Sequence, residues 1–150
     1  MKSLKIMSEG PNYSVTYIGE FDNLMDYSFL NPKTNKETQG KVFIGEILKT
    51  TGAEISFQIA LPHTRVPFVH KHRNHEEIYI FLKGSGQFQV DNTVIDVKEG
   101  TIIRVSPDGK RLWRNNTENP MIFMVIQVQS GSLDHHLTFD GFRTEDEVVW

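Results

Sequence analysis

The stretch HKHRNHEEIYIFLKG at residues 70–84 carries the pattern that decides how this sequence is interpreted. His70 and His72 are two residues apart, and on an extended backbone such residues project from the same face. Glu77 follows after a short turn, so the strand that begins there returns its carboxylate toward the two imidazole rings. Two nitrogens and one anionic oxygen suit Fe(II) and, with other supporting groups, Mn, Ni, Cu or Zn. We therefore predict a divalent metal site formed by His70, His72 and Glu77.

Two neighbours of Glu77 are alternative ligands. With Glu77 as the ligand, Tyr79 and Phe81 share its face of the strand, while Glu76 faces outward. His75 is interpreted as a turn residue, because histidines on loops are usually solvated. We retain Glu77 and expect Tyr79 and Phe81 to shape the pocket and contact a bound substrate.

Short β-prone runs separated by Gly, Asn, Asp and Pro follow one another from residue 41 to residue 129. This spacing is typical of an all-β sandwich or barrel. The runs expected to form strands are 41–49, 54–61, 77–83, 86–90, 93–97, 101–105 and 120–129. Asp91 and Asn92 tolerate the positive φ of a two-residue turn, so a β-hairpin is predicted around them.

Two of the expected strands are apolar on both faces. In 77–83 and in 120–129, apolar side chains occupy even and odd positions alike. Such a strand is buried on both sides, so one face lines the interior and the other packs on a second layer or a second subunit. A chain of 150 residues is too short to cover all of this surface, and we expect a homodimer.

The first 40 residues are less regular and are interpreted as an N-terminal extension with extra strands packed on the barrel. The run NPKTNKETQG at 31–40 is a polar loop by composition, and a short helix is expected near 23–27. Residues 41–150 would form the barrel itself. No repeat, low-complexity tract or linker divides the sequence, so we expect one structural domain overall.

The composition is that of an ordinary globular protein. Hydrophobic residues make up 38% and charged residues 23%, and 16 basic and 19 acidic residues give a net charge of -3. No basic stripe is present, so we expect no nucleic-acid partner. No apolar run approaches the roughly 18 residues of a membrane span, and none reads as a signal peptide, so we expect a cytoplasmic protein with no membrane partner. The absence of cysteine leaves six histidines available for metal chemistry.

The two-histidine stretch and a second pattern downstream resemble the cupin superfamily, in particular its small single-domain bacterial members. The first cupin motif, HxH, four residues, Glu, six residues, Gly, is filled here by His70, His72, Glu77 and Gly84. The second motif, Gly, five residues, Pro-x-Gly, two residues, His, three residues, Asn, is matched with one extra residue by Gly100, Pro107, Gly109 and Asn116. The resemblance covers residues 42–129 and implies an all-β fold of the cupin type: a double-stranded β-helix, or jelly-roll-like antiparallel barrel.

The resemblance breaks down at one position. In typical cupins the histidine of the second motif is a fourth metal ligand, and the matching residue here is Leu112. No histidine lies between Gly100 and Met121. Three ligands can still hold a metal with open positions for water and substrate. We therefore expect the Leu112 side chain to point into the cavity beside the three ligands.

Arginines and a tryptophan cluster around the second motif. The arginines are Arg104, Arg111 and Arg114, and an inward arginine could bind a carboxylate or phosphate of the substrate. We select Arg104 as the candidate, and Trp113 is a candidate to shape the pocket. The alternative, in which the arginines are surface charges over an aromatic core residue, remains open.

The function expected from these features is binding of, or action on, a small polar metabolite at a divalent metal ion in the barrel, with dioxygenase-like or isomerase-like chemistry among the options. The alternative is a metal-free binding or sensory module for a sugar or an organic acid. A third option is a metal-free sugar epimerase with His72 as a base held by Glu77. Because one fold hosts many functions, the sequence names neither the reaction nor a catalytic residue.

Overall fold

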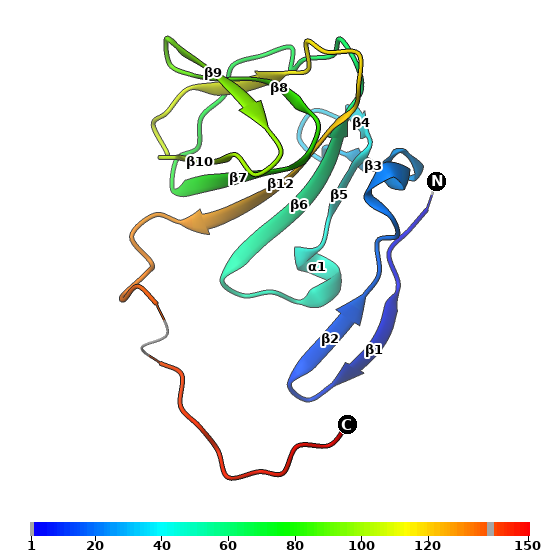
Figure 1. Cartoon of the computed structure of the whole chain (residues 1–150), viewed down its shortest axis with the longest axis vertical. Coiled ribbons are helices and arrows are strands. Elements are labelled where there is room, and N and C mark those ends of the chain that lie inside the picture. Colours follow the sequence, from blue (N-terminus) through cyan, green and yellow to red (C-terminus); the bar gives the residue numbers. More distant parts are fainter. Residues whose placement is uncertain (1, 138–139) are drawn as a thin grey trace.

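Twelve β-strands form the framework of the structure, a computed structural model that describes residues 2–137 and 140–150 (Figure 1). The N-terminal elements are β1 (Ile6–Gly10), β2 (Tyr13–Thr16), the 3-10 helix η1 (Phe21–Asp26), β3 (Ser28–Leu30), β4 (Glu37–Gln39), β5 (Lys41–Phe43) and the α-helix α1 (Gly45–Leu48). The remaining elements are β6 (Ala53–Ala60), β7 (His75–Lys83), β8 (Ser85–Val90), β9 (Thr93–Lys98), β10 (Ile102–Val105), β11 (Arg111–Arg114) and β12 (Met121–Gln129). No helix in the described part of the chain is long and apolar enough to cross a membrane. The predicted all-β class is confirmed.

Two antiparallel sheets face each other across the main core. The larger sheet has the strand order β10-β7-β12-β6-β5, and the smaller has the order β11-β8-β9. In Figure 1 the smaller sheet lies over the larger one. Within the described residues, hydrogen bonds do not close the two sheets into one ring, although isolated bridges join Arg65 to Arg114 and His70 to Arg111. The segment before β7 thereby connects to β11, in the double-stranded β-helix expected from the sequence.

Aromatic side chains fill the space between the two sheets. Phe81, Phe88 and Phe123 are at most 1% exposed, and their rings make tilted or edge contacts. Trp113 packs against Phe123 with ring centroids 5.3 Å apart, and Tyr79 packs against Phe88 at 4.6 Å. Burial of each large apolar side chain contributes about 1.5–3 kcal/mol, so this cluster holds the two sheets together.

A second apolar cluster covers part of the opposite face of the larger sheet. Leu24 in η1 and Tyr27 after it pack on residues of β5, β6 and β12. Ile122 faces this cluster, whereas its neighbour Phe123 faces the main core, as alternation along a strand requires. The first 40 residues also contain the hairpins β1–β2 and β3–β4.

The turns after β7 and β8 follow from their residues. β8 and β9 form the hairpin predicted around Asp91 and Asn92, and Asp91 has the positive φ of 51° that this turn needs. Gly84 between β7 and β8 has a φ of 77°, and a Cβ there would collide with the carbonyl oxygen of Pro120. Glycine is therefore required at the end of the first motif.

Several local predictions differ from the structure. The strand predicted at 41–49 ends at Phe43, and α1 follows, joined to β6 by a 2.9 Å hydrogen bond from the Gly45 N–H to Glu54. The polar loop predicted at 31–40 includes β4, and the helix expected near 23–27 is the 3-10 helix η1. β11 was not predicted, because its four residues, RLWR, contain no β-prone run.

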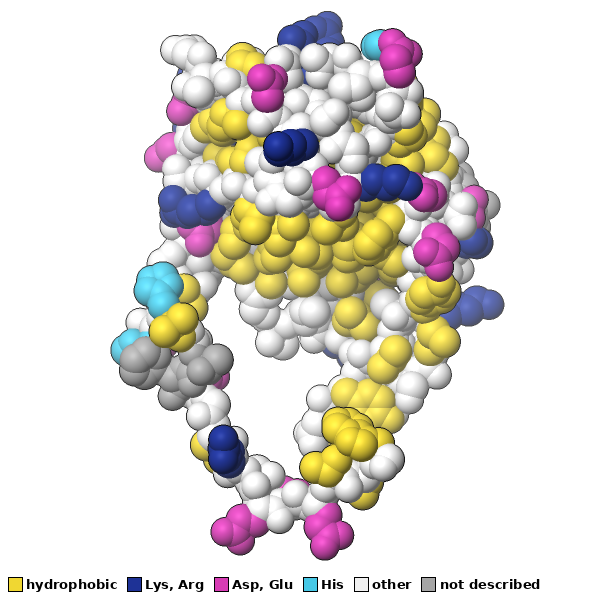
Figure 2. All heavy atoms as spheres, in the orientation of Figure 1, with side chains coloured by type: hydrophobic (Ala, Val, Ile, Leu, Met, Phe, Trp, Pro, Cys, Tyr) yellow, Lys and Arg dark blue, Asp and Glu magenta, His cyan; other side chains and the backbone are white. Residues whose placement is uncertain are grey.

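Part of the outer face of the larger sheet is uncovered. Figure 2 shows hydrophobic side chains gathered on the side of β7, β12 and β6 that faces away from the smaller sheet. Ile78, Ile80 and Ile126 on this face are partly exposed, and Ile102 on β10 is 64% exposed. The apolar outer surface predicted from the sequence pattern is therefore present.

Candidate functional site

His70 and His72 lie on the extended segment that leads into β7, alongside β11. The backbone of His70 pairs with that of Arg111 through hydrogen bonds of 2.9 and 3.2 Å, and the N–H of His72 donates to the carbonyl oxygen of Pro107 at 3.1 Å. The two imidazole rings lie together, with centroids 5.8 Å apart. The two-residue spacing therefore brings the rings together, on a bridging segment rather than within a long strand.

Glu77, the third residue of β7, faces the same interior. Its carboxylate oxygens lie 3.2 Å from Nε2 of His72 and 4.0 Å from Nε2 of His70. One ligand atom from each of the three residues lies within 4.8 Å of the others. Glu76 instead faces outward and accepts a 2.7 Å hydrogen bond from Arg104. The structure thus brings together the three residues that the sequence singled out.

Three further side chains donate hydrogen bonds to the Glu77 carboxylate. Oε2 accepts the hydroxyl of Tyr79 at 2.7 Å and the Nε–H of Arg111 at 2.9 Å, and Oε1 accepts the amide of Gln127 at 3.1 Å. A carboxylate offers about four acceptor positions, so one remains, on Oε1. Nε2 of His72 is near this oxygen but makes no well-aligned hydrogen bond in the described structure. The open position of the carboxylate therefore lies on its His72 side.

The protonation states of the site suit a cation. Burial alone would raise the pKa of Glu77, but contacts with His72 and Tyr79 and the charges of His72 and Arg111 lower that pKa to about 2. Burial lowers the pKa of His70, and the charge of Glu77 only partly opposes this effect. An ionised carboxylate beside a neutral imidazole is the state in which both groups bind a divalent ion.

Arg111, not Leu112, occupies the interior position of β11. Arg111 is 0% exposed and bonds to Glu77, whereas Leu112 is half-buried and lines a surface pocket with Val94. Buried and less buried residues alternate along β11, and Trp113 two residues on is buried like Arg111. The expectation that Leu112 points toward the ligands is therefore wrong.

The register of the second motif explains this error. Spacing counted from Pro107 and Gly109 leads to Leu112, but spacing counted from Gly100 leads to Arg111, eleven residues downstream. The extra residue before Pro107 is compensated by one fewer residue after Gly109. The place of the fourth ligand in typical cupins is thus filled by a guanidinium group.

The asparagine of the motif shifts by one residue as well. Asn115, not Asn116, is buried, with 1% exposure. Its amide donates to the carbonyl oxygens of Ala60 at 3.0 Å and Asn119 at 2.8 Å. Asn115 therefore ties the turn before β12 to the end of β6.

The residues expected to contact substrate have different positions. Tyr79 reaches Glu77 through its hydroxyl, while Phe81 and Trp113 face the same interior but lie in the main apolar core. Arg104 does not reach the site: it lies on the outer face of β10, where it forms an ion pair with Glu76. The structure brings Arg111 to the site instead of Arg104.

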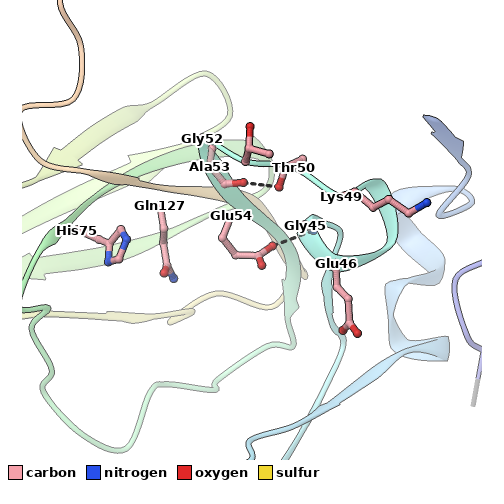
Figure 3. A pocket seen from close by; sticks show the side chains of 10 residues that line it. Gly45, Glu46, Lys49, Thr50, Gly52, Ala53, Glu54, His75 and Gln127 are labelled. Carbon is pink, nitrogen blue, oxygen red and sulfur yellow. Dashed lines mark hydrogen bonds between the residues drawn. The ribbon is translucent and has the colours of Figure 1, made fainter. Parts of the chain in front are cut away.

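A pocket of about 520 Å³ adjoins the site (Figure 3). Its lining residues are Gly45, Glu46, Lys49, Thr50, Thr51, Gly52, Ala53, Glu54, His75 and Gln127. Gln127 lies between Glu54 and Glu77 in the sheet register and donates to Glu77, so the pocket meets the site at this side chain. Pockets of this size accommodate small ligands. His75, expected in a turn, begins β7 on the pocket wall.

Gln127 is a site residue that the sequence analysis does not single out. It is a polar residue within the apolar run of β12, and this contrast is the signal that could have indicated it. Its position beside Glu77 depends on the pairing of β12 with β7, which a single sequence does not specify.

Fold and site together define a cupin, and comparisons with known proteins agree. The family described as Cupin domain matches residues 57–127. A cupin protein from Bacteroides fragilis shares 38% sequence identity with a TM-score of 0.67, over 69% of this chain and 88% of that chain. The chain belongs to the cupin family.

Other solved structures share the fold at lower identity. The plu4264 protein from Photorhabdus luminescens is 18% identical, with a TM-score of 0.57 over 70% of this chain and 82% of that chain. A predicted oxalate decarboxylase from Thermotoga maritima is 18% identical, with a TM-score of 0.56 over 69% of this chain and 90% of that chain. These likenesses concern the fold alone. No curated protein matches the sequence.

Proposed function

We propose that this cupin binds one divalent metal ion through His70, His72 and Glu77, and that a small polar metabolite binds beside the ion. The proposal rests on the convergence of two imidazole nitrogens on a buried, ionised carboxylate, with one ligand atom of each residue within 4.8 Å of the others. Exposed groups of this kind are common without a metal, but Glu77 is only 3% exposed. Its carboxylate has an open acceptor position on the His72 side, where a cation can bind.

The separations of the donor atoms are compatible with a transition metal. Ligand bonds of about 2.1 Å place neighbouring ligand atoms roughly 3 Å apart. Nε2 of His72 is already 3.2 Å from Oε1 of Glu77, and Nε2 of His70 lies 4.0 Å from Oε2. Nitrogen and carboxylate donors of this kind serve Fe(II), Mn, Ni, Cu or Zn.

The residues around Glu77 would orient it as a ligand. Tyr79, Arg111 and Gln127 fix the carboxylate by three hydrogen bonds and leave its open position on the His72 side. Such outer contacts hold metal ligands in place. When bound, the ion would act as a Lewis acid that polarises an oxygen atom of the metabolite.

A metal-free binding module with the same interior is the second candidate function. One observation favours it: the guanidinium group of Arg111 lies 2.9 Å from Glu77, at the place of the fourth ligand. A positive charge so near the carboxylate weakens the attraction of Glu77 for a cation. In this alternative the interior holds an organic ligand directly.

Metal content separates the two functions. The parent chain, purified without chelator and then exposed to each of the five ions, should carry one ion per chain by elemental analysis. The His70→Ala/His72→Ala variant should carry none while keeping its β-type circular dichroism spectrum. A His63→Ala/His136→Ala variant, altered at exposed histidines, serves as the control. A parent that takes up none of these ions would favour the metal-free module.

A further inference from the structure

Lys41 projects into the interior of the barrel from β5. In the sheet register Lys41 lies opposite Gln58 of β6. Gln58 in turn lies opposite Phe123 of β12, which is in the main core. The next residue, Val42, packs in the second apolar cluster on the other face. The ammonium group of Lys41 lies 4.9 Å from the centroid of the Phe43 ring. Lys41 is thus a cation on the inner face of the larger sheet.

The positive charge of Lys41 has no carboxylate partner. No carboxylate within residues 2–137 and 140–150 forms an ion pair with it, and the carboxylate whose charge acts on it, Glu77, already bonds to Arg111. Burial lowers the pKa of Lys41, and the charge of Glu77 offsets only part of this effect. A partly buried ammonium group without a carboxylate partner can bind an anion.

Arg111 offers a second unsatisfied donor in the interior. Its Nη1 donates to the carbonyl oxygens of Gly109 at 2.6 Å and Pro107 at 3.3 Å, and its Nε donates to Glu77. Its Nη2 is buried and finds no acceptor among the described residues. Because the backbones of Arg111 and His70 pair directly, their side chains emerge next to each other.

The charges of the inner face do not balance once a metal ion is bound. Without metal, the two cations Lys41 and Arg111 equal in number the two carboxylates, Glu77 and Glu54, so a divalent ion held by the histidines adds two positive charges. The other carboxylate on this face, Glu54, lines the pocket and accepts two backbone N–H groups. A ligand that completes the interior therefore carries negative charge.

We infer that the interior of this cupin binds a small organic acid as its carboxylate anion, recognised by Lys41 and by the free Nη2 group of Arg111. The inference rests on the proposed function and specifies the class of its metabolite. A guanidinium group donates directed hydrogen bonds to carboxylate oxygens, and an ammonium group adds a compact point charge. An uncharged sugar or alcohol would leave Lys41 unpaired.

Isothermal titration calorimetry with acetate, malonate and glutarate tests the inference, with the corresponding amides as uncharged controls. Titrations use chelator-treated protein after removal of the chelator, and Zn²⁺-loaded protein. The variants are Lys41→Met, which removes the charge, and Arg111→Lys, which keeps the charge but loses Nη2. Lys98→Met, at an exposed lysine of β9, is the matched control. Lys41→Gln replaces Lys41→Met if the latter does not fold.

We expect at least one of the carboxylates to bind to the parent and to the Lys98→Met control, whereas its amide should not bind. The Lys41→Met and Arg111→Lys variants should bind that carboxylate at least tenfold more weakly. Without ligand, Lys41→Met should be no less stable than the parent, because a partly buried charge without a carboxylate partner has been removed. Equal binding of acid and amide, no binding of any of the three acids, or unchanged affinity in Lys41→Met would overturn the inference. Carboxylate binding by a chain that takes up no metal would refute the metal proposal alone, whereas metal uptake without carboxylate binding would refute this inference alone.

Discussion

Arg111 donates its Nε–H to Oε2 of Glu77 over 2.9 Å, and the two side chains are 0% and 4% exposed. Arg111 stands where typical cupins carry a fourth ligand, so this interior combines the carboxylate of the proposed metal site with a permanent cation. The pair stabilises Glu77 in its ionised form without metal, and it leaves the face of the carboxylate near His72 open.

Acid should destabilise the protein through Glu77. The pKa of Glu77 is about 2 in the folded chain and about 4.5 in the unfolded chain, so the unfolded state binds more protons between these values. The resulting contribution, about 3 kcal/mol above pH 4.5, is lost as the pH falls toward 2. Urea unfolding of metal-free parent across this range should show the loss. Glu77→Gln should be less stable at neutral pH but lose less stability in acid, and parallel pH curves for the two proteins would contradict this account.

The Tyr79 hydroxyl should be important for stability independently of its ring. Tyr79→Phe keeps the aromatic packing but removes a 2.7 Å hydrogen bond to the buried carboxylate of Glu77. We expect a loss of about 2 kcal/mol in the free energy of unfolding, because hydrogen bonds to charged groups are the stronger ones. Tyr17→Phe, which removes an exposed 3.4 Å contact with Glu20, should change stability by less than about 0.5 kcal/mol. Similar losses of unfolding free energy in both variants would show that the hydrogen bond from Tyr79 to Glu77 stabilises the protein no more than an exposed contact.

A fourth metal ligand should be created at position 111 and not at position 112. Arg111→His removes a positive charge and places an imidazole beside His70, so it should tighten metal binding at least tenfold, about 1.4 kcal/mol. Leu112→His should leave the affinity unchanged, because this side chain faces the other side of β11. Competitive chelator titration at one pH compares both variants with the parent. Tighter metal binding in Leu112→His alone would contradict this assignment and indicate that position 112 faces the metal site.

The three candidate ligands could be predicted from the sequence because their residues are close in the chain and each pair that shares a face is set by local geometry. Residues two apart on extended backbone share a face, and this rule places His70 with His72 and Glu77 with Tyr79. The hairpin at Asp91 was equally predictable, since its turn chemistry is local. The sequence therefore contains enough information for the fold class and the first motif.

The remainder of the site depends on non-local register. Arg111 enters the interior because an extra residue before Pro107 is offset by a missing one after Gly109, and a single sequence does not reveal both changes. Lys41 and Gln127 are visible as polar residues beside apolar ones. Which face they occupy is decided by the pairing of β5, β6, β12 and β7.

The uncovered apolar face should make the protein a homodimer. Ile78, Ile80 and Ile126 lie on the outer side of the larger sheet, where hydrophobic side chains gather (Figure 2). A stable interface buries at least about 1,200 Å², and we expect light scattering at micromolar concentration to give twice the monomer mass of 17.3 kDa. Ile80→Asp should shift the protein to monomer, while Val94→Asp, at an exposed residue of β9, should not. A monomeric parent across this range would refute the prediction.

The most direct measurement of the central claim is an anomalous diffraction map from crystals of the parent chain, grown without chelator in the presence of Zn²⁺. We predict a single strong peak in the barrel interior, about 2.0–2.2 Å from one nitrogen each of His70 and His72 and from a Glu77 oxygen. Arg111 should remain bonded to the other oxygen of the carboxylate. An interior without an anomalous peak, in which His72 hydrogen-bonds directly to Glu77, would contradict the claim that these three residues form a metal site.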